Sequence, residues 1–304
     1  MSPLQPKGGL AAAQVAFFAP ALLISTYIVF RHGLRRQLGW LYLVLLSILR
    51  LVGASATLWS ETQNDYSKSI LQTAFITSAV GTAPLLLVLL GFMQLVNKDM
   101  KTAGSAVGIW VFRGIHLLSL AALVLAILGG TDISSTISST VSLGHTLLKA
   151  GSIVFLVIYL ALAAITFLTF SRKYAVLTEE RKLVDAGLAA LPFLLVRIIY
   201  TVVVSFAGKG SIFYLWNVNV YVSAFMQFLM EAFVVVIFMT AGLLTPKRAK
   251  TVGQRGPEYA SVGSEYDMEN GGHQMGPQRV RQHEQQNIGG YRPSRLIRNA
   301  MRGS

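Results

Sequence analysis

The sequence contains no cysteine and few charged side chains. Without cysteine the chain has no disulfide framework, no thiolate nucleophile and no cysteine ligand for a metal. Charged residues make up 13% of the chain, about half the share found in ordinary soluble domains, whereas hydrophobic residues make up 53%. This imbalance indicates a membrane protein.

Several chemistries are excluded by what the apolar part of the chain lacks. A retinal Schiff base needs a lysine in the last membrane helix, and residues 218–244 contain none. A zinc site needs about three protein ligands, but only His116 lies inside an apolar run. The chain also has neither a Gly-x-Ser-x-Gly nucleophile elbow nor a phosphate-binding glycine loop. We therefore expect no enzymatic activity, no cofactor and no metal.

Acidic residues are also scarce, and the formal net charge of +13 reflects 26 Lys and Arg against 13 Asp and Glu. Much of this charge lies beside long apolar runs or in the final segment of the chain. That placement favours attraction to anionic lipid headgroups over binding of nucleic acid. Membrane lipids are the expected partners, and a nucleic-acid partner is not expected.

Seven stretches are long and apolar enough to cross a bilayer, which requires about 20 residues each. They are Leu10–Phe30, Gly39–Trp59, Ile70–Val96, Ala106–Leu128, Leu147–Phe170, Ala186–Phe206 and Val218–Leu244. The sequence thus predicts an all-α integral membrane bundle of seven transmembrane helices. The pattern leaves open whether its membrane is the plasma membrane or an endomembrane.

Basic residues in the short connections predict the orientation of the bundle. Connections after the first, third and fifth stretches carry the larger set, namely Arg31, Arg35, Arg36, Lys98, Lys101, Arg172, Lys173, Arg181 and Lys182. The opposite side has the smaller set, Lys7, Lys68, Lys149 and Lys209. Because positively charged loops stay in the cytoplasm, we predict that the N-terminus is outside and the C-terminus cytoplasmic.

The composition changes after residue 245. Pro246-Lys247-Arg248-Ala249-Lys250 opens a segment rich in Gly, Gln, Pro and Arg, which has too few aliphatic residues to bury a core. We therefore predict three parts: a short outer N-terminus (1–9), the seven-helix domain (10–245) and a disordered basic cytoplasmic tail (246–304). The tail is a candidate binding segment for a cytoplasmic protein.

Three charged residues fall near the middle of predicted membrane helices. Arg197 lies eleven residues after Ala186, roughly 16 Å into a bilayer core of about 30 Å. Similar spacing places Arg50 and Glu231 near the same depth. A bidentate ion pair between Glu231 and one of the arginines is the simplest arrangement, because each charge offsets the desolvation of the other.

The charges inside the membrane do not balance, however. With Arg113 included there are three arginines and one carboxylate, and only Arg113 lies near enough to a helix end to reach the interface. A backbone carbonyl, water or an anionic ligand must accept the remaining cation. The polar candidates for such a cavity, each of which could equally be a packing residue, are His116, Tyr200 and Gln227.

The sixth stretch also carries a resemblance. The segment Leu191-Pro192-Phe193-Leu194-Leu195-Val196-Arg197-Ile198-Ile199-Tyr200, with Arg50 before it and Met230-Glu231 after it, resembles a family of fungal seven-helix membrane proteins of undefined function. The likeness covers roughly residues 10–243. More distantly, the layout of Arg197, Ile198, Ile199, Tyr200, Gly208 and Gly210 resembles fungal RTA-like proteins, which are proposed lipid-translocating exporters.

These observations favour one function and leave two others open. A polar cavity around Arg50, Arg197 and Glu231 would suit transport or translocation of a lipid or a small amphiphilic anion. The predicted topology is also that of G-protein-coupled receptors, so a receptor-like sensor is the alternative. A non-catalytic membrane scaffold is the third.

Overall fold

The computed structural model describes residues 5–32, 38–63, 68–100, 107–133, 137–172, 181–208, 210–214 and 219–245. The helices are α1 (Pro6–His32), α2 (Leu38–Thr62), α3 (Lys68–Val80), α4 (Thr82–Met100), α5 (Ile109–Asp132), α6 (Ser138–Ser171), α7 (Arg181–Phe206), α8 (Val220–Val222) and α9 (Met230–Leu244). A π-helix over Ser223–Leu229 joins α8 to α9. Within these ranges there is no strand, and the all-α prediction is confirmed. The predicted tail, 246–304, lies outside the described residues.

Seven helical segments of the described chain are long and apolar enough to cross a membrane. They are Pro6–His32, Gly39–Thr62, Gln72–Lys98, Ile109–Asp132, Ser138–Ser171, Arg181–Phe206 and Val220–Leu244. Each overlaps one of the predicted stretches, so the seven-span prediction is confirmed. Length and composition together indicate an integral membrane protein.

Several helices extend beyond the apolar stretch that predicted them. The first span (α1) begins at Pro6 rather than Leu10. The fifth span (α6) begins at Ser138 rather than Leu147, and the sixth span (α7) begins at Arg181 rather than Ala186. His32 is the last residue of α1. The reason is that hydropathy marks where a helix meets lipid, whereas backbone hydrogen bonding continues into polar residues at its ends.

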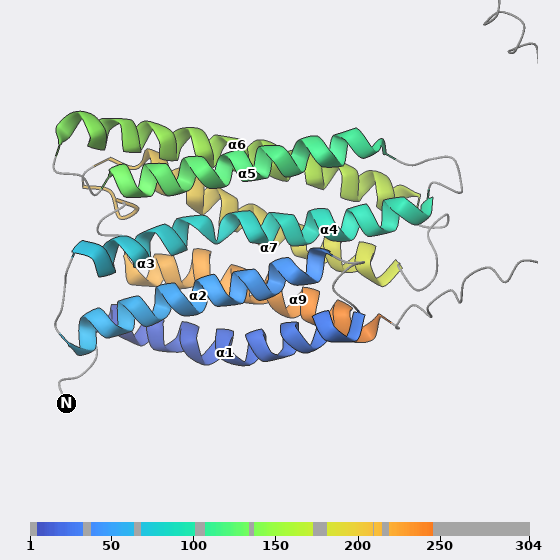
Figure 1. Cartoon of the computed structure of the whole chain (residues 1–304), viewed down its shortest axis with the longest axis horizontal. Helices are drawn as coiled ribbons and strands as arrows, with labels where there is room; N and C mark the ends of the chain where they lie inside the picture. Colours follow the sequence, from blue (N-terminus) through green and yellow to red (C-terminus); the bar gives the residue numbers. More distant parts are fainter. Residues whose placement is uncertain are drawn as a thin grey trace, which may run out of the picture. The chain divides into compact units, whose positions relative to one another are not determined.

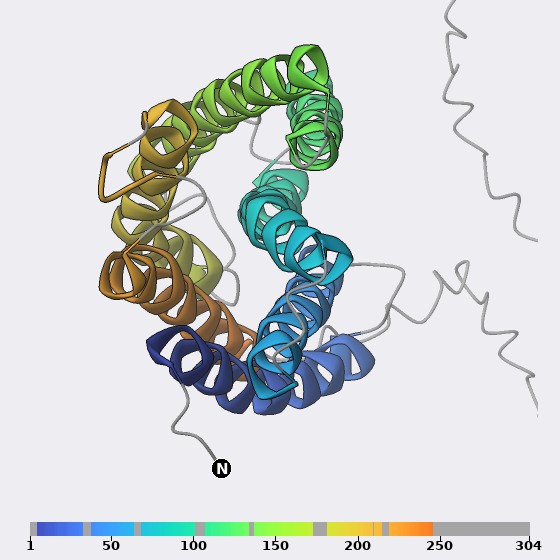
Figure 2. The same cartoon turned by 90° about the vertical axis from the view of Figure 1, so that its left-hand side faces the viewer.

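The spans follow one another around the bundle in chain order, from α1 to α9, which returns to α1 (Figures 1 and 2). The third span departs from this order, because α4 contacts α2, α5, α6 and α7. In its most apolar window 78% of residues are buried, against 28% to 44% in the other spans. The core of the bundle therefore forms around α4, which faces protein on nearly every side.

The third span is interrupted at Gly81, between the end of α3 and the start of α4. Pro84 lies in the first turn of α4, where a missing backbone N–H costs no hydrogen bond. Pro192 lies inside α7.

An aromatic cluster fills the end of the bundle at which α9 terminates, which we call the C-terminal end. The ring centroid of Trp40 lies 4.4 Å from that of Phe92, and Phe92 meets Phe238 edge to face at 5.1 Å. All three rings are almost completely buried. Gly242 allows this packing, because a methyl group there would lie 2.7 Å from Trp40 Cζ3.

Basic side chains cover the last turn of α9 at the same end. Arg31 Nη1 donates a hydrogen bond to the Leu243 carbonyl, and Lys182 Nζ donates one to the Leu244 carbonyl. These carbonyls have no acceptor role inside the helix, and the cations oppose the negative end of its dipole. Arg31 and Lys182, which we assigned to one side of the membrane, thus lie at one end of the bundle.

Candidate functional site

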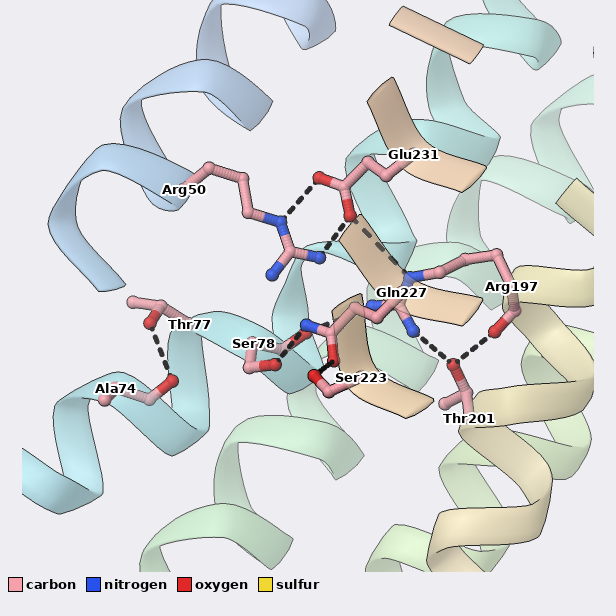
Figure 3. A network of polar contacts seen from close by, with 9 residues as sticks. All are labelled: Arg50, Ala74, Thr77, Ser78, Arg197, Thr201, Ser223, Gln227 and Glu231. Carbon is pink, nitrogen blue, oxygen red and sulfur yellow. Dashed lines mark hydrogen bonds and ion pairs between the residues drawn. The ribbon is translucent and has the colours of Figure 1, made fainter. Parts of the chain in front are cut away.

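A charged cluster lies between α2, α7 and α9 (Figure 3). Arg50 of α2 donates from both Nε and Nη2 to the two carboxylate oxygens of Glu231 in α9. The fork of the guanidinium matches the carboxylate, and charge assistance strengthens both bonds. Arg50 is 5% exposed and Glu231 is completely buried, so water contributes little to this pair.

Arg197 of α7 forms a longer and therefore weaker ion pair with the same carboxylate. Its Nε lies 3.7 Å from Glu231 Oε2, which is too long for a hydrogen bond. Nη1 donates to Thr201 Oγ1 at 2.9 Å and Nη2 donates to the Ser78 carbonyl at 3.3 Å. The buried Nε finds no hydrogen-bond acceptor in the described part of the chain.

The cluster carries a surplus positive charge. Arg50 and Arg197 contribute two cations and Glu231 one anion, while Arg197 is only 2% exposed. A buried cation without a full counter-charge is costly, because the protein interior replaces little of its lost hydration. The arrangement would be completed by one further negative charge near Arg197.

The interruption of the third span positions both arginines. A methyl group on Gly81 would lie 2.9 Å from Arg50 Nη2 and 3.0 Å from its Cζ, so glycine lets the chain lie against the guanidinium without displacing it. Ser78 belongs to the last turn of α3, where carbonyls have no intrahelical partner. Its carbonyl is therefore available to accept the hydrogen bond from Arg197.

The π-helix meets this interruption directly. Gln227, one of its residues, donates from Nε2 to Ser78 Oγ and accepts a hydrogen bond from Ser223 Oγ at 3.4 Å (Figure 3). The two irregular segments of the third and seventh spans are thus joined beside the charged cluster. Such π segments within α-helices occur often at functional sites.

A cavity of about 290 Å³ lies next to the cluster. Its cations are Lys7, Arg50 and Arg197, and its hydroxyl groups come from Thr57, Thr77, Ser78, Ser152, Tyr200, Thr201, Ser205 and Ser223. No acidic residue is among the described residues that line it, and Glu231 is completely buried. The cavity therefore presents a positive and hydrogen-bonding floor.

The cavity extends from the cluster to the end of the bundle at which α1 begins, which we call the N-terminal end. Its lining on α7 runs from Arg197 to Ser205, which corresponds to roughly 12 Å at the helical rise. Lys7, in the first turn of α1, also lines it and is exposed. In the opposite direction the aromatic cluster of Trp40, Phe92 and Phe238 fills the bundle.

Five of the predicted site residues come together here. Arg50, Arg197, Tyr200 and Gln227 line the cavity, and Glu231 pairs with the arginines. The Tyr200 ring centroid lies 5.8 Å from Arg197 Cζ, within the range of a cation–π contact.

Arg113 and His116 lie elsewhere. Arg113 is exposed near the start of α5, with its Cζ 5.1 Å from the ring centroid of Trp110. His116 is half-buried, and its ring centroid lies 6.2 Å from that of Tyr42. The long apolar stem of an arginine this close to a helix end allows its charge to reach the surface.

Sequence reasoning missed the residues that hydrogen-bond the cluster. Thr201 follows Arg197 by one helical turn, and this spacing could have identified it. Ser78 carried no such signal, because its role depends on where α3 ends. Lys7 was counted as an outer charge, but nothing in the sequence linked it to the buried arginines.

Residues 4–248 match the family described as domain of unknown function (DUF7702). None of the curated proteins compared with the chain matches it. The matched region contains all seven spans and every residue of the charged cluster. A fungal origin and a likeness to RTA-like exporters stay predictions. The chain belongs to the DUF7702 family.

Proposed function

We propose that the protein binds a small amphiphilic anion in the cavity and moves it through the membrane bundle. The observation that carries this proposal is the buried surplus charge of Arg197 at the floor of a cavity that has no acidic residue among its described lining residues. A carboxylate or phosphate group would provide the missing negative charge and accept charge-assisted hydrogen bonds.

The cavity walls favour an amphiphilic ligand over a simple inorganic anion. Apolar side chains, among them Leu49, Leu148, Phe155 and Val204, line the same cavity as the arginines. Ligand pockets commonly combine such walls with a few polar groups that fix the orientation of the ligand. The apolar body of the ligand would displace water from these walls and add to the affinity.

Two structural features favour transport over a purely sensing role. The third span is discontinuous and the seventh contains a π-helix, and both irregular segments border the cavity. Discontinuous membrane helices often form the substrate sites of secondary transporters. If the predicted orientation holds, the cavity is accessible from the outer side of the membrane.

The decisive variant is Arg197→Gln. Removing this arginine leaves Arg50 and Glu231 as a balanced pair, so the variant should unfold at the same temperature as the wild type or at a higher one. Binding of decanoate should nevertheless weaken about tenfold to a hundredfold, because a hydrogen bond to a charged partner is lost together with the surplus charge. Both properties would be measured on protein in nanodiscs, by thermal unfolding and calorimetry.

Arg113→Gln is the matched control, because it removes an arginine that lies outside the cavity. It should leave decanoate binding unchanged. Equal binding by wild type and Arg197→Gln would overturn the proposal.

Flux separates transport from sensing. Proteoliposomes loaded with decanesulfonate, which stays ionised and crosses bare lipid slowly, should exchange it with wild-type protein and not with Arg197→Gln. Binding without flux would exclude transport and support the receptor-like alternative.

A further inference from the structure

Lys7 lies where two hollows of the N-terminal end share residues. It lines the 290 Å³ cavity and also a second hollow of about 500 Å³, and Val220 is common to both. The second hollow is lined mainly by polar and small residues, including Ser211, Tyr214 and Asn219. Lys7 thus places a positive charge at the mouth of the cavity, opposite the arginines at its floor.

The two charged ends are separated by a passage whose walls combine apolar side chains with hydroxyl groups. The α7 lining spans roughly 12 Å at the helical rise, and Ala126, Leu148 and Val204 are among the residues of its walls. Counting Lys7, Arg50 and Arg197 against Glu231, the site has two surplus positive charges, one at each end. Neither hollow has an acidic residue among its described lining residues.

A ligand with a single anionic group fits this arrangement poorly. With its anionic group on the arginines, its apolar chain would point outward to Lys7 and to the polar residues of the second hollow. An apolar chain end would add no binding free energy beside an ammonium group and hydroxyls, because these polar groups stay hydrated. A second anionic group at that end would instead meet Lys7.

We infer that the ligand is an elongated dianion, such as a long-chain dicarboxylate, with one anionic group on the arginines and the other on Lys7. This inference rests on the proposed function and narrows its ligand class. Lys7 is then a specificity-determining residue that distinguishes a dianion from a monoanion of equal length. The polar second hollow leaves room for the outer group to stay hydrated.

The test compares decanoate with decanedioate, which differ in the second carboxylate, on wild-type and Lys7→Gln protein in nanodiscs. Lys7→Gln should weaken decanedioate binding about fivefold, as expected for one exposed ion pair. Decanoate binding should change less than twofold, because at physiological salt a charge one cavity length away is largely screened. Partition of the ligands into lipid does not affect the result, because the affinity of each ligand for the wild type is compared with the affinity of the same ligand for Lys7→Gln.

Two controls complete the design. Lys7→Arg keeps the charge and should retain the preference for decanedioate. Lys98→Gln removes an exposed lysine from the last turn of α4, outside both hollows, and should change neither affinity.

The outcomes separate this inference from the proposed function. If Lys7→Gln weakens both ligands equally or neither of them, the dianion inference is wrong, while the site at Arg197 is unaffected. If Arg197→Gln also binds both ligands as tightly as the wild type does, the proposed function fails as well.

Discussion

The two ends of the bundle are built in opposite ways from the same helices. At the C-terminal end α2 contributes Trp40 and α9 contributes Phe238 to a packed aromatic cluster. Toward the N-terminal end the same two helices contribute Arg50 and Glu231, which lie beside a cavity of about 290 Å³. One end is filled by apolar side chains and the other is hollow and positively charged.

Because only the N-terminal end of the described bundle is hollow, the cavity can be reached from that end and not from the packed C-terminal end. Large aromatic rings exclude water and hold α1, α2, α4 and α9 together, whereas small and hydroxylated side chains leave room for a ligand. The boundary between the two regions is the layer of Arg50, Arg197 and Glu231. The interruption of the third span also lies at this layer, where it frees the Ser78 carbonyl for Arg197, and the π-helix meets it through Gln227.

The largest effect is expected from Glu231→Gln, which removes the only acidic partner of the cluster in the described chain. Arg50 and Arg197 would remain as two buried cations, and breaking a buried pair in this way costs about 3 to 5 kcal/mol. Thermal unfolding in detergent should show a clear loss of stability, or the yield of folded protein should fall.

Adding a second substitution to Glu231→Gln shows which arginine pairs more strongly with Glu231. Because Arg50 forms the bidentate pair, the double variant Arg50→Gln/Glu231→Gln should recover more stability than Arg197→Gln/Glu231→Gln. Arg113→Gln combined with Glu231→Gln is the control and should recover none. If the stability losses of Arg50→Gln and Glu231→Gln simply add in the double variant, the two residues are not paired.

An intermediate effect is expected from Gly242→Ala at the filled end. The added methyl group would lie 2.7 Å from Trp40 Cζ3 and 3.0 Å from Ile28 Cγ2, and overpacking of this kind costs about 1 to 3 kcal/mol. Gly114→Ala is the matched control, because nothing lies within 4 Å of the added carbon. It should be neutral or stabilising by up to about 1 kcal/mol, since alanine favours helix more than glycine does. Equal melting temperatures for the two variants would show that the filled end is not tightly packed.

The smallest effect is expected from Gln227→Leu, which removes the hydrogen bond to Ser78 that joins the two irregular segments. The loss of free energy of unfolding should be about 1 kcal/mol, the usual net value of one hydrogen bond. Adding Ser78→Ala should cost little more, because the partner hydroxyl is then also gone. Losses that add fully in chemical denaturation would mean that the bond does not stabilise the bundle.

The sequence was sufficient to identify the seven spans and to predict that three charges share one level of the bundle, where the structure brings them together. Long apolar runs have few alternatives to helices in a membrane, because every backbone N–H and C=O must be hydrogen-bonded within the segment. Arg50, Arg197 and Glu231 are conspicuous within those runs because a charged side chain is costly to remove from water. The helical rise predicted similar depths for the three charges.

Only the tertiary structure decided which charges pair and where the cavity lies. Arg50 takes both carboxylate oxygens, and Gly81 lies against its guanidinium at an interruption of the third span that no sequence period predicts. Arg113 has the same charge as Arg197 but points to the surface, because it lies near a helix end. Pairing depends on the rotation and packing of helices far apart in the chain, and hydropathy contains no information about either.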